Sequence, residues 1–243
     1  MSAHKLFINS KSLSSKNTAR YWQDFLEKNN FDFNSIEKID MLNECPVIFD
    51  KLGNKFSIDF VNNKLSYVKP KGSIKMELIS KAMGSGKHGL RLLDLSAGLA
   101  IDAVFLAQLG YAVTALERNP LIYLALSEAL QKKPEKTQKL NLEFIFIDAI
   151  QYLKNQTLIT DVIYFDPMFP EKIKSALPKQ EMVFFKKLVG PDEDATEVLR
   201  AALKVKGIKR VVVKRPRKAL ALLKPMASIE GKLIRFDLYS GAK

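Results

Sequence analysis

The amino-acid sequence predicts an α/β fold, with a mostly parallel, doubly wound sheet preceded by a small β-rich N-terminal subdomain. From residue 91 onward, strand-like and helix-like apolar segments alternate, whereas short β-prone runs separated by turn residues fill residues 47–68. Strands that alternate with helices form βαβ crossovers, which give parallel sheets with helices on both faces. We therefore expect residues 1–72 to form an N-terminal helix plus the β-rich subdomain, and residues 73–243 to form the main domain.

In the N-terminal part, the aromatic spacing of residues 18–28 predicts an amphipathic helix that follows the possible cap Asn17. The runs VIFDKL, KFSIDFV and KLSYV then read as short strands, because Gly53-Asn54 and Asn62-Asn63 are typical hairpin-turn pairs. Residues 69–73 read as a linker that leads into the main domain.

The main domain is predicted element by element from its hydrophobic period and its helix-ending glycines. The expected helices cover residues 74–83, 100–109, 120–133 and 196–205. The expected strands cover residues 91–95, 112–117, 142–148, 161–166 and 210–214. The alternation in residues 232–240 predicts a final strand at the edge of the sheet.

Composition and charge narrow the class of protein. The chain has 243 residues, with 39 Lys and Arg against 26 Asp and Glu, a formal net charge of +13 that favours a polyanionic partner or a merely basic surface. A lone Cys45 and two histidines exclude a disulfide scaffold and disfavour a structural zinc site. Without a signal-like N-terminus or a membrane-length apolar run, we expect a cytoplasmic protein with no membrane or metal partner.

Four acidic residues follow predicted strands: Asp94, Glu117, Asp148 and Asp166. In an open parallel sheet, ligands bind beyond the carboxyl ends of the strands, so these residues are the first candidates for a site. Glu117 lies 117 − 94 = 23 residues after Asp94, near the offset at which an acid binds ribose hydroxyls. A solvated carboxylate at a strand end is the structural alternative.

Two turns carry further candidates. The turn from Asp94 to Asp102 opens a helix with small residues, although Gly98 is its only glycine, so the glycine motif is weak. Asp148 and Ala149 open the following helix, where they could face an adenine ring or simply cap the helix.

The segment Asp166-Pro167-Met168-Phe169-Pro170 presents a carboxylate and an aromatic ring on a proline-stiffened strand end. An acceptor there could hold an exocyclic amine, while Phe169 stacks on a base. An ordinary proline-rich turn is the alternative.

Several longer stretches together resemble a known family. The sequence from about residue 55 to 241 is similar to class I S-adenosylmethionine-dependent methyltransferases, and among them to the ribosomal RNA small subunit methyltransferase J family. The resemblance is carried by SAGLAIDAVFLAQLG, LERNP, YFDPMFPEKIKSALPKQEM, KKLVGPDEDA, KRVVVKRP and RFDLYSG. It implies a Rossmann-like methyltransferase fold and methyl transfer from S-adenosyl-L-methionine to N2 of a guanine near the 3′ end of 16S rRNA. The implied partner is the rRNA or the assembled 30S subunit.

The resemblance also implies which residues form the site. The implied cofactor contacts are Ile101, Asp102, Glu117, Arg118, Asp148, Ala149 and Asp166, which join Asp94 and Gly98. Asp166, the Pro167 carbonyl and Phe169 would act on the base. The family typically has Gly-Arg-Asp where this chain has Ala100-Ile101-Asp102, so Ile101 offers only backbone and apolar contacts.

Lysines and arginines flank the two loops that we expect to meet rRNA. These side chains would contact the phosphates of the RNA backbone. Near the Asp166 motif and after the strand at residues 210–214 these are Lys172, Lys174, Lys179, Lys214, Arg215, Arg217 and Lys218. A single lysine is also commonly just solvated.

Three other functions compete with the methylation of guanine. A methyltransferase could act on the amine of adenine or cytosine, or the fold could be a catalytically silent RNA-binding or assembly factor. An NAD-dependent oxidoreductase shares the first βαβ unit, but it would need the fuller G-x-G-x-x-G turn that this sequence lacks.

Overall fold

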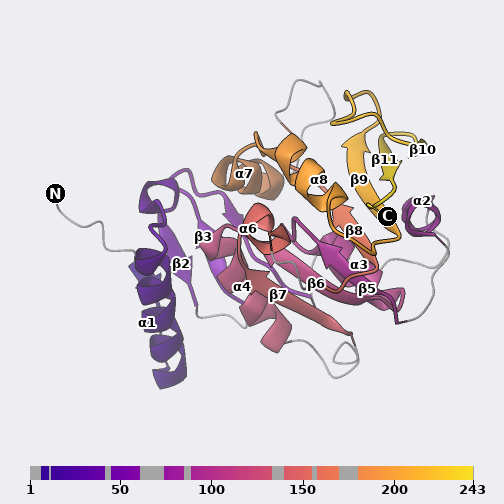
Figure 1. Cartoon of the computed structure of the whole chain (residues 1–243). Coiled ribbons are helices and arrows are strands. Elements are labelled where there is room, and N and C mark those ends of the chain that lie inside the picture. The colour runs from indigo at the N-terminus through magenta and orange to yellow at the C-terminus, as the bar shows by residue number, and fades with distance from the viewer. Residues whose placement is uncertain are drawn as a thin grey trace. The chain divides into compact units, whose positions relative to one another are not determined.

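The structure is a computed structural model that describes residues 7–10, 12–41, 45–60, 74–84, 89–132, 140–154, 158–169 and 180–242 (Figure 1). The chain divides into two compact units. The first unit comprises Met1–Asn63, Asn119–Pro134 and Pro170–Pro191. The second comprises Lys64–Arg118, Glu135–Phe169 and Asp192–Lys243.

The first unit contains the long helix α1 (Leu13–Lys28). The prediction that Asn17 caps this helix was wrong, because the helix begins earlier at a capping box in which Ser12 and Ser15 satisfy each other's backbone N–H groups. Trp22 and Leu26 are buried on one face, as the helical spacing predicted. Phe25 stacks on Tyr123 of helix α4 (Pro120–Gln131), with 5.7 Å between the ring centroids.

A small sheet completes this unit, with β1 (Phe7–Asn9), β2 (Lys38–Asp40), β3 (Val47–Phe49) and β4 (Lys55–Phe56) in that order. A short 3-10 helix (Phe33–Ser35) precedes β2. Gly53, at φ +79°, makes the predicted turn between β3 and β4. Helix α7 (Gln180–Val189) packs on β4 through Phe184 and Phe56, whose ring centroids are 5.3 Å apart. The predicted KLSYV strand and the Asn62-Asn63 turn lie outside the described residues.

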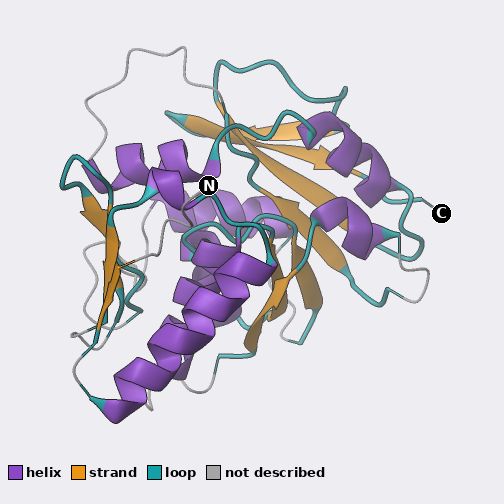
Figure 2. Ribbon diagram, turned by 90° about the vertical axis from the view of Figure 1, so that its left-hand side faces the viewer, coloured by secondary structure: helices purple, strands orange, loops and turns teal. Residues whose placement is uncertain are grey.

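The second unit is built on a seven-stranded sheet of order β10-β11-β9-β8-β5-β6-β7. Figure 2 shows its strands in orange with helices packed against them. Its strands are β5 (Arg91–Asp94), β6 (Ala112–Glu117), β7 (Leu142–Phe146), β8 (Val162–Phe165), β9 (Arg210–Pro216), β10 (Ala227–Glu230) and β11 (Ile234–Tyr239). The five strands from β9 to β7 are parallel, which confirms the doubly wound prediction. The chain runs outward from β5 through β6 to β7 and then returns to β8 on the other side of β5, so the strand order reverses between β5 and β8.

Helices cover both faces of this sheet. Helices α6 (Ala149–Leu153) and α8 (Ala195–Leu203) pack on one face. Val198 and Leu199 of α8 belong to the same buried hydrophobic cluster as Ile163 and Val211 of the sheet. The opposite face presents Tyr164, whose hydroxyl meets α3 (Ile101–Gln108). Helix α2 (Ile74–Met83) contacts β9, β10 and β11, and ends at Gly84 as predicted.

The prediction that the last strand lies at the sheet edge was wrong. β11 lies between β10 and β9 and is antiparallel to both, so β10 is the edge. Both faces of β11 are covered, since Phe236 and Asp237 have no exposed surface and Arg235 is also buried. The presence of a further strand outside β11 could not be predicted, because β10 is four residues long and mostly exposed and therefore has no apolar pattern. Within the described part of the chain, no helix has both the length and the apolar character needed to cross a membrane.

Candidate active site

The reversal of strand order between β5 and β8 brings Asp94 and Asp166 to neighbouring strand ends, where ligands bind in this kind of sheet. Asp94 is almost fully buried and accepts a hydrogen bond from the Ser96 amide at 2.9 Å. The Ser96 hydroxyl in turn accepts the Asp166 amide at 2.8 Å. The loop after β5 is therefore tied to the segment after β8. Burial raises the pKa of Asp94 to about 7.

The loop after β5 is also hydrogen-bonded to the end of β6. The Ala97 amide donates to the Leu116 carbonyl at 2.8 Å, and the Gly98 amide donates to Glu117 Oε2 at 3.0 Å. Gly98 and Ala100 both have left-handed backbone angles, at φ 52° and 56°. This conformation suits glycine, whereas a side chain such as that of Ala100 is strained in it. The loop after β5 and the end of β6 are thus joined by a direct hydrogen bond between Gly98 and Glu117.

Lys214, on β9, joins two of the candidate carboxylates. Its ammonium lies 2.6 Å from Asp102 Oδ2 and 2.5 Å from Asp166 Oδ2. The Tyr164 hydroxyl donates to the same Asp102 oxygen at 2.9 Å. These two carboxylates raise the pKa of Lys214 above its usual value, against the opposing effect of burial. The arrangement links the first turn of α3 to the motif after β8.

Arg118 organises a second cluster just beyond β6. Its guanidinium forms ion pairs with Asp192, with Asp194 at 2.8 Å and more distantly with Asp148 at 3.9 Å. Asp192 also accepts the Met168 amide at 2.6 Å, so this cluster positions the motif after β8. Asp148 caps α6 by accepting from two backbone amides, at 2.9 and 3.1 Å.

Phe169 is partly buried against a cation. The Arg215 guanidinium carbon lies 3.4 Å from the centre of the Phe169 ring. Arg215 is only 4% exposed, and its Nε and Nη1 find no hydrogen-bond partner among the described residues. Burial and the nearby Arg235 lower the pKa of Arg215 to about 10. One face of the Phe169 ring is therefore covered by a poorly solvated cation.

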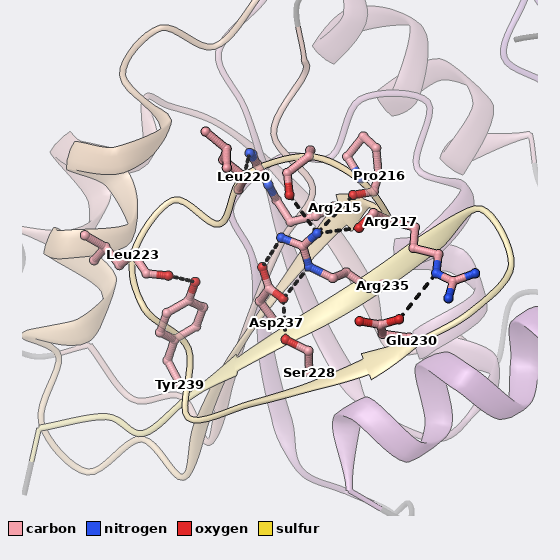
Figure 3. A network of polar contacts seen from close by, with 11 residues as sticks. Arg215, Pro216, Arg217, Leu220, Leu223, Ser228, Glu230, Arg235, Asp237 and Tyr239 are labelled. Carbon is pink, nitrogen blue, oxygen red and sulfur yellow. Dashed lines mark hydrogen bonds and ion pairs between the residues drawn. The ribbon is translucent and has the colours of Figure 1, made fainter. Parts of the chain in front are cut away.

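The loop that follows β9 is held by a buried ion pair (Figure 3). Arg235 binds both oxygens of Asp237 at 2.8 and 3.1 Å, and its Nη1 also donates to the carbonyls of Arg217 and Ala219 at 2.6 and 2.7 Å. Arg215 donates to the Leu220 carbonyl in the same loop. This network fixes the loop that supports Arg215 over Phe169.

The structure gathers most of the predicted site residues at these strand ends. Those placed there are Asp94, Gly98, Ile101, Asp102, Glu117, Arg118, Asp148, Ala149, Asp166, Pro167 and Phe169. Lys172, Lys174 and Lys179 lie outside the described residues. Lys214 and Arg215 were expected in a loop that faces phosphates, but β9 extends to Pro216, and both side chains are enclosed within the protein.

Sequence reasoning did not single out Asp192, Tyr164 or Arg235. Asp192 lies in the GPDEDA stretch, whose density of acids was an available signal, whereas Tyr164 and Arg235 resemble ordinary strand residues in the sequence. Among the described residues, no group of three His, Cys, Asp or Glu side chains could hold a metal ion. The carboxylates instead suit ligands rich in hydroxyl and amine donors, such as a nucleoside.

Comparisons with known proteins all point to one family. The family model described as "Putative SAM-dependent methyltransferase" (SAM is S-adenosylmethionine) matches residues 35–241. A protein from Bdellovibrio bacteriovorus named ribosomal RNA small subunit methyltransferase J is 50% identical over 75% of this chain and 73% of its own length. A protein of the same name from Legionella pneumophila is 41% identical over 76% of each chain. The crystal structure of a SAM-dependent methyltransferase from Neisseria gonorrhoeae has a TM-score of 0.69 and 25% identity, covering 98% of this chain and 97% of that one.

Proposed function

Because this chain belongs to the SAM-dependent methyltransferase family that includes ribosomal RNA small subunit methyltransferase J, we propose that it methylates N2 of a guanine in 16S rRNA. The observation that carries this proposal is the meeting of Asp166 with the loop after β5 at the switch point of the sheet, with Phe169 three residues further along the same segment. A segment that offers both a carboxylate and an aromatic ring suits a base that carries an exocyclic amine.

The cofactor of this family is SAM, which supplies an electrophilic methyl group on a sulfonium sulfur. The donors and acceptors at β5, β6 and β7 fit such a nucleoside. Glu117, buried at the end of β6, would accept from the ribose hydroxyls. Gly98, which has no side chain and donates its amide to Glu117, would let the cofactor come close to the loop backbone. Asp148 and Ala149 would border the adenine ring.

The substrate side is formed by the segment after β8. We assign Asp166 and the Pro167 carbonyl as acceptors for the amine protons, and Phe169 as the platform on which the base stacks. Since Arg215 covers one face of the Phe169 ring, the base would take the other face.

Catalysis on this assignment is mainly positioning. The lone pair of a guanine amine is delocalised into the ring, and hydrogen bonds from the amine to fixed acceptors favour the geometry in which it can attack. When bound, SAM would supply the methyl group, and its sulfur would leave with the bonding electron pair as the amine nitrogen takes the methyl. The surplus proton of the methylated amine would pass to water. Asp166 holds the amine throughout this displacement.

The rRNA would approach over the loop that follows β9. Arg217, Lys218 and Leu220 are exposed there, and this loop is held in place by the Arg235 network (Figure 3). With Lys214 and Arg215 enclosed, the exposed Arg217 and Lys218 are the better candidates for phosphate contacts. Lys172, Lys174 and Lys179 remain candidates on sequence grounds.

The test is methyl transfer from radiolabelled SAM to unmodified 30S subunits and to naked 16S rRNA. Asp166→Ala should abolish turnover while SAM binding remains measurable by calorimetry, weakened at most in proportion to the loss of one of the implied cofactor contacts. Asp161→Ala is the matched control, because Asp161 lies at the opposite end of β8, where it pairs with Arg91 and Lys209. Full activity of Asp166→Ala would refute the assignment, and a wild-type protein that binds no SAM would indicate a silent RNA-binding factor.

A further inference from the structure

Lys214 lies in the site without a role in the cofactor and base contacts proposed above. Its ammonium is mostly buried, with 16% of the side chain exposed, and lies at ion-pair distance from both Asp102 and Asp166. Those carboxylates come from α3 and from the end of β8, which are 64 residues apart in sequence (166 − 102). A lysine in this position is not available to an RNA phosphate, so its charge serves the interior of the site.

Charge balance explains why a cation is needed there. Asp94 on β5, Asp102 on α3 and Asp166 after β8 interact electrostatically with one another and with Lys214, and Tyr164 adds a hydroxyl donor. Buried carboxylates without a cation repel one another and take up protons. Lys214 is the only cation among the described residues that forms an ion pair with Asp102 or Asp166.

We propose that Lys214 is a positioning residue for methyl transfer: it holds the Asp166 carboxylate ionised and oriented toward the target amine, and joins it through Asp102 to the helix that begins at the cofactor loop. This inference rests on the proposed function, because it gives Asp166 the role of acceptor. Lys214 itself touches neither the base nor the reacting methyl group.

The proposal predicts a pH signature. An opposite charge at this distance lowers a carboxyl pKa by about 1–3 units, and with 36% of the Asp166 side chain exposed we expect the lower part of that range. Without the ammonium, Asp166 would protonate at a higher pH, since the Asp102 carboxylate opposes its ionisation and Tyr164 brings no positive charge. Asp94, with a pKa of about 7, is itself largely protonated in the acid range and adds little repulsion there. A protonated Asp166 offers fewer acceptor sites to the amine. The acid limb of the rate profile should therefore move upward.

The experiment compares wild type with Lys214→Met, which preserves the apolar stem and removes the charge. We expect kcat to fall about 100-fold, as for other losses of alignment at a reacting centre, with the SAM Kd changed by only a few-fold. The acid limb of kcat against pH should rise by about 1–2 units. Lys214→Arg should recover part of the activity. Lys209→Met is the control, because that lysine precedes β9 at the opposite end and pairs with Asp161.

A second variant separates positioning from folding. Lys214→Met combined with Asp102→Asn removes one charge of each sign, so it should restore thermal stability without restoring kcat. Recovery of kcat together with stability would overturn the proposal, because Lys214 would then serve only to neutralise charge. An unchanged acid limb in Lys214→Met would overturn it as well.

A readout without turnover distinguishes this proposal from the proposed function. The carboxyl carbons of aspartate, labelled with carbon-13, report ionisation by NMR in the protein without RNA. Lys214→Met should raise the pKa of the resonance that Asp166→Asn removes. If wild type transfers no methyl group to rRNA, the proposed function fails. The absence of this pKa rise would refute the role of Lys214 regardless of activity.

Discussion

Replacing Arg235 by methionine tests how the loop after β9 is held. Arg235 binds both oxygens of Asp237 and donates to the carbonyls of Arg217 and Ala219. Asp237 has no exposed surface, and its other partner among the described residues is the Ser228 hydroxyl at 2.7 Å. Arg235→Met keeps the apolar stem but leaves a buried carboxylate without its cation.

The expected cost follows from that burial. Removing one partner of a buried ion pair destabilises a protein by about 3–5 kcal/mol, because the remaining charge is left uncompensated. For a chain of this size, each kcal/mol corresponds to about 2–4 °C, so Tm should fall by about 6–20 °C. Arg235→Met combined with Asp237→Leu removes both charges and should recover most of the loss.

The assay is urea unfolding followed by circular dichroism, together with thermal melts of both variants and wild type. The loop should also loosen in Arg235→Met, so Arg215 should lose its place over Phe169 and kcat/KM should fall more than the SAM affinity. A loss below about 1 kcal/mol in the single variant, the range of an exposed pair, would refute the reasoning. So would a double variant no more stable than the single one.

Three further changes have definite expected outcomes. Ala100→Gly should stabilise the protein by about 1 kcal/mol, because glycine adopts the left-handed backbone of this position without strain; a loss of Tm would contradict this. The folded-state pKa of Asp94, about 7 against 3.8, means that unfolding free energy declines as pH rises between those values. Asp94→Asn should flatten that decline in urea titrations from about pH 5 to about pH 8, and an unaltered slope would show that Asp94 is not its source. Changing Lys218 to Gln should lower the salt dependence of rRNA binding, as the slope of log K against log salt, by about 0.7–0.9; an identical slope would remove Lys218 from the interface.

Much of the fold could be predicted because its determinants are local. The helix-ending Gly84, the turn at Gly53 and the alternation of strands and helices from residue 91 all depend on neighbours in sequence. The start of α1 was missed because two serines form a capping box ahead of the apolar pattern. The place of β11 was missed because pairing with a short, exposed β10 leaves no trace in hydropathy.

The part of the site formed by residues at the carboxyl ends of strands could be predicted from the sequence. Asp94, Glu117 and Asp166 were expected to converge because parallel strands bring their carboxyl ends to one edge. The surroundings of Lys214 could not be foreseen, since its partner Asp102 lies 112 residues away (214 − 102) and burial of a lysine depends on such distant contacts. Resemblance to the methyltransferase family supplied the cofactor, whereas the structure supplied the contacts between the candidates.

The reaction proposed for this protein is transfer of a methyl group from SAM to N2 of guanine in small-subunit rRNA. The most direct measurement is to incubate it with isotopically labelled SAM and unmodified 30S subunits, digest the RNA and identify the labelled nucleoside by mass spectrometry. We expect labelled N2-methylguanosine with wild type and none with Asp166→Ala. Label on adenosine or cytidine, or no labelled nucleoside from subunits or naked rRNA although SAM binds, would contradict it.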